Sequence, residues 1–293
     1  MLERKGRKTK EIIVKKIKEK HIDAFLHNLR EEERSEATVG KYLRDVRRFR
    51  EYIGQKSIDK GTVLSYKEYL CQKYAISSAN SMLSSLNSFF SFLGWHELRV
   101  RCVKVQRQLF IGSERELTRA EYKRLLDKAR GRKDPRLYLL IQTICSSGIR
   151  VSELRYITVE ALKTEKAEIS CKGKLRCVFL TTELCKMLLK YAETQKIKSG
   201  PVFISKNGIP LDRSNIWCEM KRLGKEAGVD GRKVFPHNLR HLFARTYYTV
   251  EKDIVRLADI LGHSSINTTR IYTTESGEIH RRQLGRLGLV EEL

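Results

Sequence analysis

Apolar residues recur every three or four positions through the first hundred residues, which is the spacing of amphipathic helices. The pattern becomes regular from about Ile12 and continues through Ile22, Phe25 and Leu29. Further apolar stripes follow, and Gly94 is a stop signal after the last of them. The pattern predicts helices over about 12–29, 38–53, 60–74 and 78–92. We therefore expect a small all-helical domain of four or five helices.

The second part of the chain begins with equally clear helix signals. Thr118 and Glu121 have the spacing of a capping box. A long apolar stretch over 136–147 predicts a helix that ends at Gly148, and another short helix is expected from about Val151. Helices are also expected from Ser214 onward.

Between these helices the apolar period changes to that of strands. Segments 167–171 and 177–180 predict two strands, joined by a tight turn at Lys172, Gly173 and Lys174. Residues 202–204, followed by an Asn-Gly turn at 207–208, suggest a second short strand pair. The predicted fold class is mainly α, with a mostly helical second domain that carries a small antiparallel β-sheet.

The length of 293 residues favours two domains. A basic segment, Arg99 to Arg107, separates the two patterns. We divide the chain into a basic N-terminal segment 1–14, a helical domain 15–103, a basic linker 104–113 and a second domain 114–293.

Charge gives the first indication of function. The chain has 59 Lys and Arg against 35 Asp and Glu, a formal net charge of +24. Such an excess favours a polyanionic partner, and nucleic acid is the commonest one, because bound cations release counterions from phosphates. A merely soluble basic protein or a membrane-surface binder remains open on charge alone. The polar face of the helix at 38–53 offers four candidate DNA-binding residues: Lys41, Arg44, Arg47 and Arg48.

Cysteine usage and hydropathy bear on location. The seven cysteines are odd in number and include no C-x-x-C pair, which predicts reduced thiols and neither a disulfide framework nor a zinc site. The sequence has no apolar run long enough for a membrane helix and no secretory signal pattern. These features predict a cytoplasmic protein that does not associate with membranes.

Five short stretches of the second domain carry unusual polar residues. Arg150 follows Gly148 at a helix end, with Glu153 three residues on to hold its guanidinium. His237 and Arg240 share a helix face, and Gly262 turns His263 out of a helix. Lys172 in the turn and Tyr272 on a short helical segment complete the set.

Each of these residues alone is more often structural: a surface ion pair, a solvated lysine, a core histidine, a packed tyrosine. Together they supply what phosphoryl transfer without a metal requires. Arginines and histidines stabilise charge on the phosphate, a phenol attacks, and an acid protonates the leaving oxygen. No carboxylate cluster for Mg²⁺ accompanies them, so we expect neither a metal nor another cofactor.

The order and spacing of these residues resemble the tyrosine recombinase (phage integrase) family, in particular Xer-type recombinases and integrases of mobile elements. The stretches GIRVSEL, HNLRHLFA and LGHSSINTTRIYT carry the resemblance, which covers about residues 15–293. It implies that the first domain is a core-binding domain that clamps DNA and that the second is catalytic. The family's catalytic set falls on Arg150, Lys172, His237, Arg240, His263 and Tyr272.

The resemblance also implies roles for these residues. Tyr272 would form a 3′-phosphotyrosyl link, Arg150, Arg240 and His263 would bind the phosphate, Lys172 would protonate the leaving 5′-oxygen, and His237 would act as general base. Glu153 would support Arg150. Further DNA contacts are expected from three cations of the second domain: Lys174, Arg176 and Arg270.

Two positions depart from the family pattern. The hairpin has one residue fewer between its Lys-Gly and the following arginine, which leaves Lys172 and Lys174 as alternatives, with Lys172 favoured by its place before Gly173. Asn238 stands where an aspartate is common, and we expect it to be a supporting residue.

Double-stranded DNA with specific sites is the partner that the resemblance implies, with four subunits assembling on it. The apolar C-terminal segment 280–293 is expected to contact a neighbouring subunit, and the alternative is that it folds back on its own domain. A type IB topoisomerase-like enzyme and a non-catalytic DNA-binding protein are the rival functions. The sequence leaves open whether the task is integration and excision of an element or resolution of DNA dimers.

Overall fold

The computed structural model describes residues 15–104, 115–171, 174–272 and 285–287. The chain divides into two compact units, residues 1–107 and 108–293. Within the described ranges, no helix is both long and apolar enough to cross a membrane.

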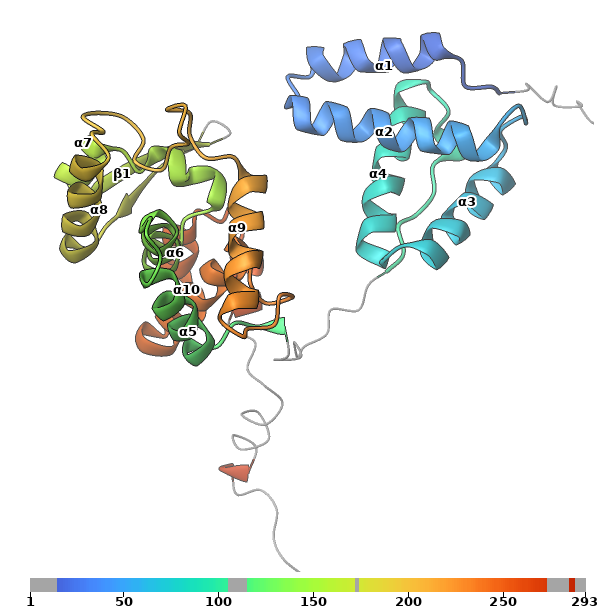
Figure 1. Ribbon diagram of the computed structural model, residues 1–293. Coiled ribbons are helices and arrows are strands. Elements are labelled where there is room, and N and C mark those ends of the chain that lie inside the picture. The colour runs from blue at the N-terminus through green and yellow to red at the C-terminus, as the bar shows by residue number, and fades with distance from the viewer. Residues whose placement is uncertain (1–14, 105–114, 172–173, 273–284, 288–293) are drawn as a thin grey trace, which may run out of the picture. The chain divides into compact units, whose positions relative to one another are not determined.

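The regular elements described in the first unit are all helices (Figure 1). Its elements are α1 (Glu19–Glu31), α2 (Glu36–Ile53), α3 (Lys60–Lys73), α4 (Ile76–Phe92) and the 3-10 turn η1 (His96–Leu98). Apolar positions from all four helices meet in one core, where Phe25, Phe49 and Phe89 are fully buried. The predicted helices 38–53, 60–74 and 78–92 are confirmed to within two residues.

Ile12, near which the first helix is predicted to start, lies outside the described residues, but residues 15–18, predicted to be helical as well, are not in a helix. Lys15 lies in an isolated antiparallel bridge with Ile58, and the Ile58 backbone N–H donates to the Lys15 carbonyl at 2.9 Å. Lys15 is extended and paired with Ile58, so it cannot belong to the helix, which begins at Glu19.

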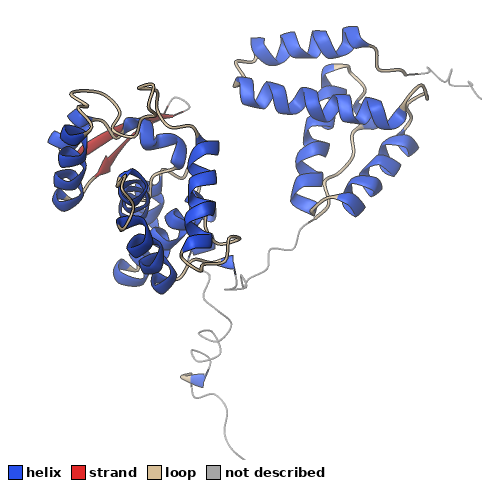
Figure 2. Cartoon of the chain, viewed as in Figure 1, coloured by secondary structure: helices blue, strands red, loops and turns tan. Residues whose placement is uncertain are grey.

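The second unit is mostly helical and carries one small sheet (Figure 2). Its helices are α5 (Arg119–Arg130), α6 (Arg136–Ser147), α7 (Val159–Lys163), α8 (Thr182–Thr194), α9 (Arg213–Glu226), α10 (Pro236–Glu251), α11 (Ile254–Leu261) and α12 (Ile266–Thr269). The 3-10 turns are η3 (Val151–Tyr156) and η4 (Arg270–Tyr272). The capping box of Thr118 and Glu121 at the start of α5 is confirmed.

The sheet is the predicted hairpin. Strands β1 (Lys166–Cys171) and β2 (Lys174–Phe179) pair antiparallel with Cys171 opposite Lys174. The second predicted strand pair is wrong, because residues 202–210 form only an isolated bridge between Ile204 and Pro210. Proline has no backbone N–H to continue a ladder, which accounts for the single bridge.

Two features of this unit place side chains for chemistry. Helix α6 packs against α10, and both α6 and α11 end in glycines with left-handed backbone, Gly148 and Gly262. These caps confirm the predicted helix ends and turn the chain sharply at two points beside α10. A small apolar cluster, separate from the main core, gathers residues of α10, α11 and η4: Ala244, Leu257, Leu261 and Tyr272.

Candidate active site

Arg240 is the centre of the site. Its side chain projects from α10 and is 2% exposed. Arginine is rarely buried without partners, and here both terminal nitrogens have them. Its Nη1 donates to the Gly148 carbonyl at 2.5 Å, and its Nη2 donates to the Leu261 carbonyl at 2.7 Å. Carbonyls at helix C-termini carry partial negative charge, so the ends of α6 and α11 hold the cation. Burial, followed by repulsion from Arg150, lowers the pKa of Arg240 to about 10, so it stays charged at neutral pH.

His263 lies beside Arg240, directly after the Gly262 turn. Its Nε2 is 3.1 Å from Nη2 of Arg240, and its Nδ1 is 2.9 Å from Oγ1 of Thr269, which is fully buried. Burial is the largest cause that lowers the pKa of His263 to about 4, and repulsion from Arg240 and Arg150 adds to it. The imidazole is therefore neutral at physiological pH in the free protein.

Arg150 is held by a buried carboxylate. Glu153, 2% exposed, accepts from Nη1 of Arg150 at 2.9 Å and from the Arg150 backbone N–H at 2.7 Å. Nη2 of Arg150 reaches the Gly262 carbonyl at 3.4 Å, next to His263. The pairing of Arg150 with Glu153 is confirmed, and the alternative of an ordinary surface ion pair is wrong because the carboxylate is buried.

Arg176 is held by protein groups at both ends of its guanidinium. Its Nη2 donates to Glu153 at 2.5 Å, and its Nη1 donates to the Ile260 carbonyl near the end of α11. Its side chain is 14% exposed. The guanidinium thus links strand β2 to η3 and α11. Both of its ends have protein partners, and the DNA contact predicted for Arg176 stays a prediction.

Tyr272 belongs to the same cluster. It is 4% exposed in the turn η4, and its ring stacks near that of His263 with centroids 6.0 Å apart. The edge-on ring of His241 is closer, at 4.7 Å with an interplanar angle of 79°. Ile266, three residues before Thr269, is 45% exposed, because α12 is only one turn long and tightens into η4.

His237 and His241 lie one turn apart on α10. Their Nε2 atoms are 3.0 Å apart, and their rings are perpendicular. Burial lowers the pKa of both, that of His241 to about 4. His241 is not among the site residues predicted from the sequence. Its i, i+4 spacing from His237 was the available signal, but nothing in the sequence places it against Tyr272.

Asn238 supports the start of α10. Its Nδ2 donates to the carbonyls of Arg115 and Lys233, each at 2.8 Å. An aspartate could donate to neither carbonyl, so the amide suits this position. The expected supporting role therefore has a structural basis.

The two candidate lysines are not distinguished. Lys172 lies outside the described residues, and for Lys174 only the backbone is described, at the start of β2. Lys172 remains favoured by the sequence.

The cations predicted to bind DNA from α2 differ in their surroundings. Lys41 is used internally, because its Nζ donates to Asp45, to the Ser81 carbonyl and to Ser85, each at 2.8 Å. Arg44 is exposed, Arg48 is exposed over the ring of Tyr74, and Arg47 is exposed with a long 3.9 Å ion pair to Glu19. Arg270, beside Tyr272, is exposed as well. The DNA contacts predicted for Lys41, for the three arginines of α2 and for Arg270 stay predictions, and the exposed arginines are better placed for them than Lys41.

Metal-binding groups do not gather in the part of the chain that the structure describes: no three or more His, Cys, Asp or Glu residues could hold an ion there. Six cysteines whose side chains the structure describes are free thiols: Cys71, Cys102, Cys145, Cys177, Cys185 and Cys218.

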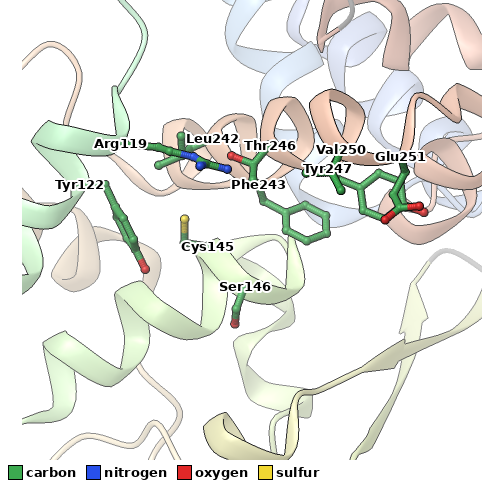
Figure 3. A pocket seen from close by; sticks show the side chains of 10 residues that line it. All are labelled: Arg119, Tyr122, Cys145, Ser146, Leu242, Phe243, Thr246, Tyr247, Val250 and Glu251. Carbon is green, nitrogen blue, oxygen red and sulfur yellow. The ribbon is translucent and has the colours of Figure 1, made fainter.

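A cavity of about 530 Å³ lies between α5, α6 and α10 (Figure 3). Its wall is largely apolar and includes Leu242, Phe243, Tyr247 and Val250. Phe243 and Tyr247 also pack against the apolar cluster that contains Tyr272. One layer of side chains therefore connects the cavity with the candidate nucleophile.

Comparison with known proteins gives concordant results for both units. Residues 115–278 match the model of the phage integrase family, and residues 22–97 match that of the phage integrase N-terminal SAM-like domain. Tyrosine recombinase XerA of Thermococcus kodakarensis is 31% identical over 283 residues, covering 93% of this chain and 96% of that protein. XerA of Pyrococcus furiosus is 28% identical, with coverage of 95% and 98%.

Solved structures show the same fold. The crystal structure of XerA recombinase aligns with a TM-score of 0.51 at 25% identity, covering 94% of this chain and 99% of that one. A lambda integrase dimer bound to a core site aligns with a TM-score of 0.71 at 17% identity, covering 87% and 94%.

Proposed function

The chain belongs to the phage integrase family and is a tyrosine site-specific recombinase that cleaves and rejoins DNA, and from this premise we propose that Tyr272 is its nucleophile. The observation that carries the assignment is the contact of the Tyr272 ring with His241 and His263, the latter hydrogen-bonded to Arg240. A phenol, two histidines and a buried guanidinium thus lie together in one unit.

The proposed reaction exchanges one phosphodiester for another. The Tyr272 oxygen attacks the scissile phosphorus, a 3′-phosphotyrosyl bond forms, and the bond to the 5′-oxygen breaks. His237 takes the phenol proton, and Lys172 gives a proton to the departing 5′-oxygen. A 5′-hydroxyl of a partner strand then attacks the phosphotyrosine and restores the phosphodiester.

Arg150 and Arg240 are the proposed phosphate ligands. Both guanidiniums face the turn at Gly262 and His263, and Glu153 fixes the direction of Arg150. Positive charge that is already oriented stabilises the negative charge that develops on the non-bridging oxygens. His263 adds a hydrogen bond to the same oxygens once its Nε2 carries a proton.

We further propose that each subunit uses its own Tyr272. The ring packs against α10 and α11 of the same chain, so the nucleophile needs no neighbour to bring it to the arginines.

The test is covalent trapping. The full chain is first used to select its binding site from a pool of random duplexes. It is then mixed with that duplex carrying a nick beside the cut, so that the released fragment diffuses away. Wild-type protein is expected to give a denaturant-resistant adduct, and Tyr272→Phe is expected to bind equally and give none. An adduct with Tyr272→Phe would disprove the assignment.

The partners are proposed as double-stranded DNA with specific sites and a tetramer of this chain on two such sites. In the first domain, 15–103, the exposed Arg44, Arg47 and Arg48 of α2 would neutralise phosphates of the DNA backbone. The catalytic domain, 114–293, would bind the same duplex. The two-domain division and the linker at 104–113 are part of this proposal.

The C-terminal segment 280–293 is proposed to dock on a neighbouring subunit. Its apolar residues suit the cavity lined by Leu242, Phe243 and Tyr247, and Leu287 is 59% exposed in its own subunit. Deletion of 282–293 should then reduce pairing of two sites more than cleavage of one. Equal loss of both activities would contradict docking in trans.

Recombination differs from topoisomerase activity in joining two sites. A strand-joining assay with two differently labelled duplexes is expected to give a recombinant product, whereas relaxation of supercoils alone would support the type IB topoisomerase alternative. Since the substrate is chromosomal or element DNA, we expect the protein to act in the cytoplasm or nucleoid. Integration or excision of an element and resolution of dimers are both compatible with this chemistry.

A further inference from the structure

His241 contacts both reacting partners of the proposed proton transfer. It lies on α10 one turn after His237, and its Nε2 is 3.0 Å from Nε2 of His237. The edge of its ring also meets the ring of Tyr272, at 4.7 Å between centroids. In the described part of the chain, His241 is the one residue whose ring contacts the rings of both His237 and Tyr272.

The surroundings of His241 favour a neutral ring. The charged or titratable groups that face it are His237, Arg240 and Arg245 from α10, with Tyr272 from η4. Burial is the largest cause that keeps the pKa of His241 low, at about 4, and the neighbouring cations act in the same direction. A neutral imidazole has one nitrogen that only accepts, and Nε2 of His241 can fill that role toward His237.

The direction of this hydrogen bond decides which nitrogen of His237 is available. If His237 donates its Nε2–H to His241, its Nδ1 retains a lone pair and can take a proton. If the direction is reversed, Nδ1 of His237 carries the hydrogen and cannot act as a base. Orientation of a base by a second group is a common requirement of nucleophile activation.

We propose that His241 is a positioning residue: it accepts the Nε2–H of His237, which leaves Nδ1 of His237 free as the base, and its ring edge holds the ring of Tyr272. One side chain thereby fixes the base and the nucleophile. The proposal rests on the assignment of Tyr272 and His237 above.

Two substitutions separate the two contacts. In His241→Gln the amide reaches the position of Nε2 and can still accept from His237, but it cannot titrate. In His241→Phe the ring remains beside Tyr272, but the acceptor is lost. The readout is single-turnover formation of the covalent adduct on the nicked duplex between pH 5 and 9.

His241→Phe is expected to form the adduct about tenfold more slowly, whereas His241→Gln stays within about threefold of wild type. The acid limb of the rate profile is expected to move to lower pH in His241→Phe, because protonated His237 loses its acceptor. His237 is also faced by Arg150, Arg213 and Arg240, and their repulsion is the same in both variants. A wild-type rate and profile for His241→Phe, or equal loss in both variants, would overturn the proposal.

A measurement on the unaltered protein covers the case in which a variant does not fold. Imidazole nitrogen shifts from selectively labelled full-length protein are expected to show His237 protonated on Nε2 and His241 protonated on Nδ1. The opposite pair of tautomers would refute the proposal. An adduct with Tyr272→Phe would instead remove the premise, so the two failures are distinguishable.

Discussion

Nη2 of Arg240 lies 3.1 Å from Nε2 of His263, and the chemistry of the two groups sets the direction of that hydrogen bond. A guanidinium only donates, so Nε2 of His263 accepts. The ring proton of neutral His263 is then on Nδ1, which donates to Thr269 Oγ1 at 2.9 Å. In the free protein His263 is therefore in the tautomer that cannot donate from Nε2. To donate to a bound phosphate, Nε2 must first take up a proton from solvent, or the ring must change its tautomer.

Thr269→Val should slow cleavage. The substitution keeps the shape of a fully buried side chain but removes the acceptor of the His263 Nδ1–H. Leaving a buried donor unpaired costs about 1–3 kcal/mol, which predicts a loss of roughly fivefold to a hundredfold in the single-turnover rate if the cost falls on the active geometry. The exposed neighbour provides the control, since Thr268→Val should cleave normally. Equal rates for the two variants would argue against a role of Thr269 in orienting His263.

Glu153→Gln should reduce both stability and cleavage. The buried carboxylate of Glu153 joins Arg150 to Arg176, and an amide can satisfy only part of these contacts. We expect a loss of about 1–3 kcal/mol in the free energy of unfolding, measured in urea. The pair of Arg132 with Glu226 is more exposed, so Glu226→Gln should lower the free energy of unfolding much less than Glu153→Gln does. A Glu153→Gln protein as stable and active as Glu226→Gln would contradict the proposed support of Arg150.

Local signals made the helix ends and the hairpin predictable. Gly148 and Gly262 mark helix ends because a left-handed backbone is cheap only for glycine, and this chemistry is visible in the sequence. The positions of Arg150 and His263 after these turns follow from the same signals.

Partners that are distant in the chain were not predictable. Arg176 pairs with Glu153, 23 residues away, and Lys41 with Ser85, 44 residues away. Because such distant partners cannot be recognised in the sequence, both cations were predicted as DNA contacts. His241 meets Tyr272 only because η4 returns to α10. Exposure of a cation and contact of two rings are properties of the packed structure, which local periodicity does not contain.

Gly148→Ala should be far more harmful than an alanine at a matched glycine. Gly148 has φ +66°, and an added Cβ would lie 2.4 Å from a ring carbon of Phe243. Gly228 has φ +63° with nothing within 4 Å of such a Cβ. Gly228→Ala therefore carries only the left-handed backbone cost of about 1–2 kcal/mol.

Gly148→Ala adds overpacking of about 1–3 kcal/mol to the same backbone cost. Its carbonyl also binds Arg240, so cleavage should fall along with the free energy of unfolding. Equal destabilisation of the two variants, measured in urea, would show that Phe243 moves aside without cost.

Acidification should destabilise the second unit through His241 and His263. Both have a pKa lowered from 6.5 to about 4 in the folded protein, mainly by burial. Between these values the unfolded chain binds more protons than the folded one, so the free energy of unfolding falls as pH falls from about 6.5 to 4. Each histidine contributes a slope of at most about 1.4 kcal/mol per pH unit.

Urea unfolding at pH 7.5, 6.0 and 5.0 measures this slope. His263→Gln should flatten it, because glutamine can still accept from Arg240 but does not titrate. His27→Gln, at an exposed position of α1, should leave the slope of the second unit unchanged. Since folded His263 resists protonation next to Arg240, bound DNA should reduce the slope as well: the phosphate offsets the repulsion that keeps the ring neutral. An identical slope in wild type and His263→Gln would mean that His263 takes up its proton as easily in the folded site as in the unfolded chain.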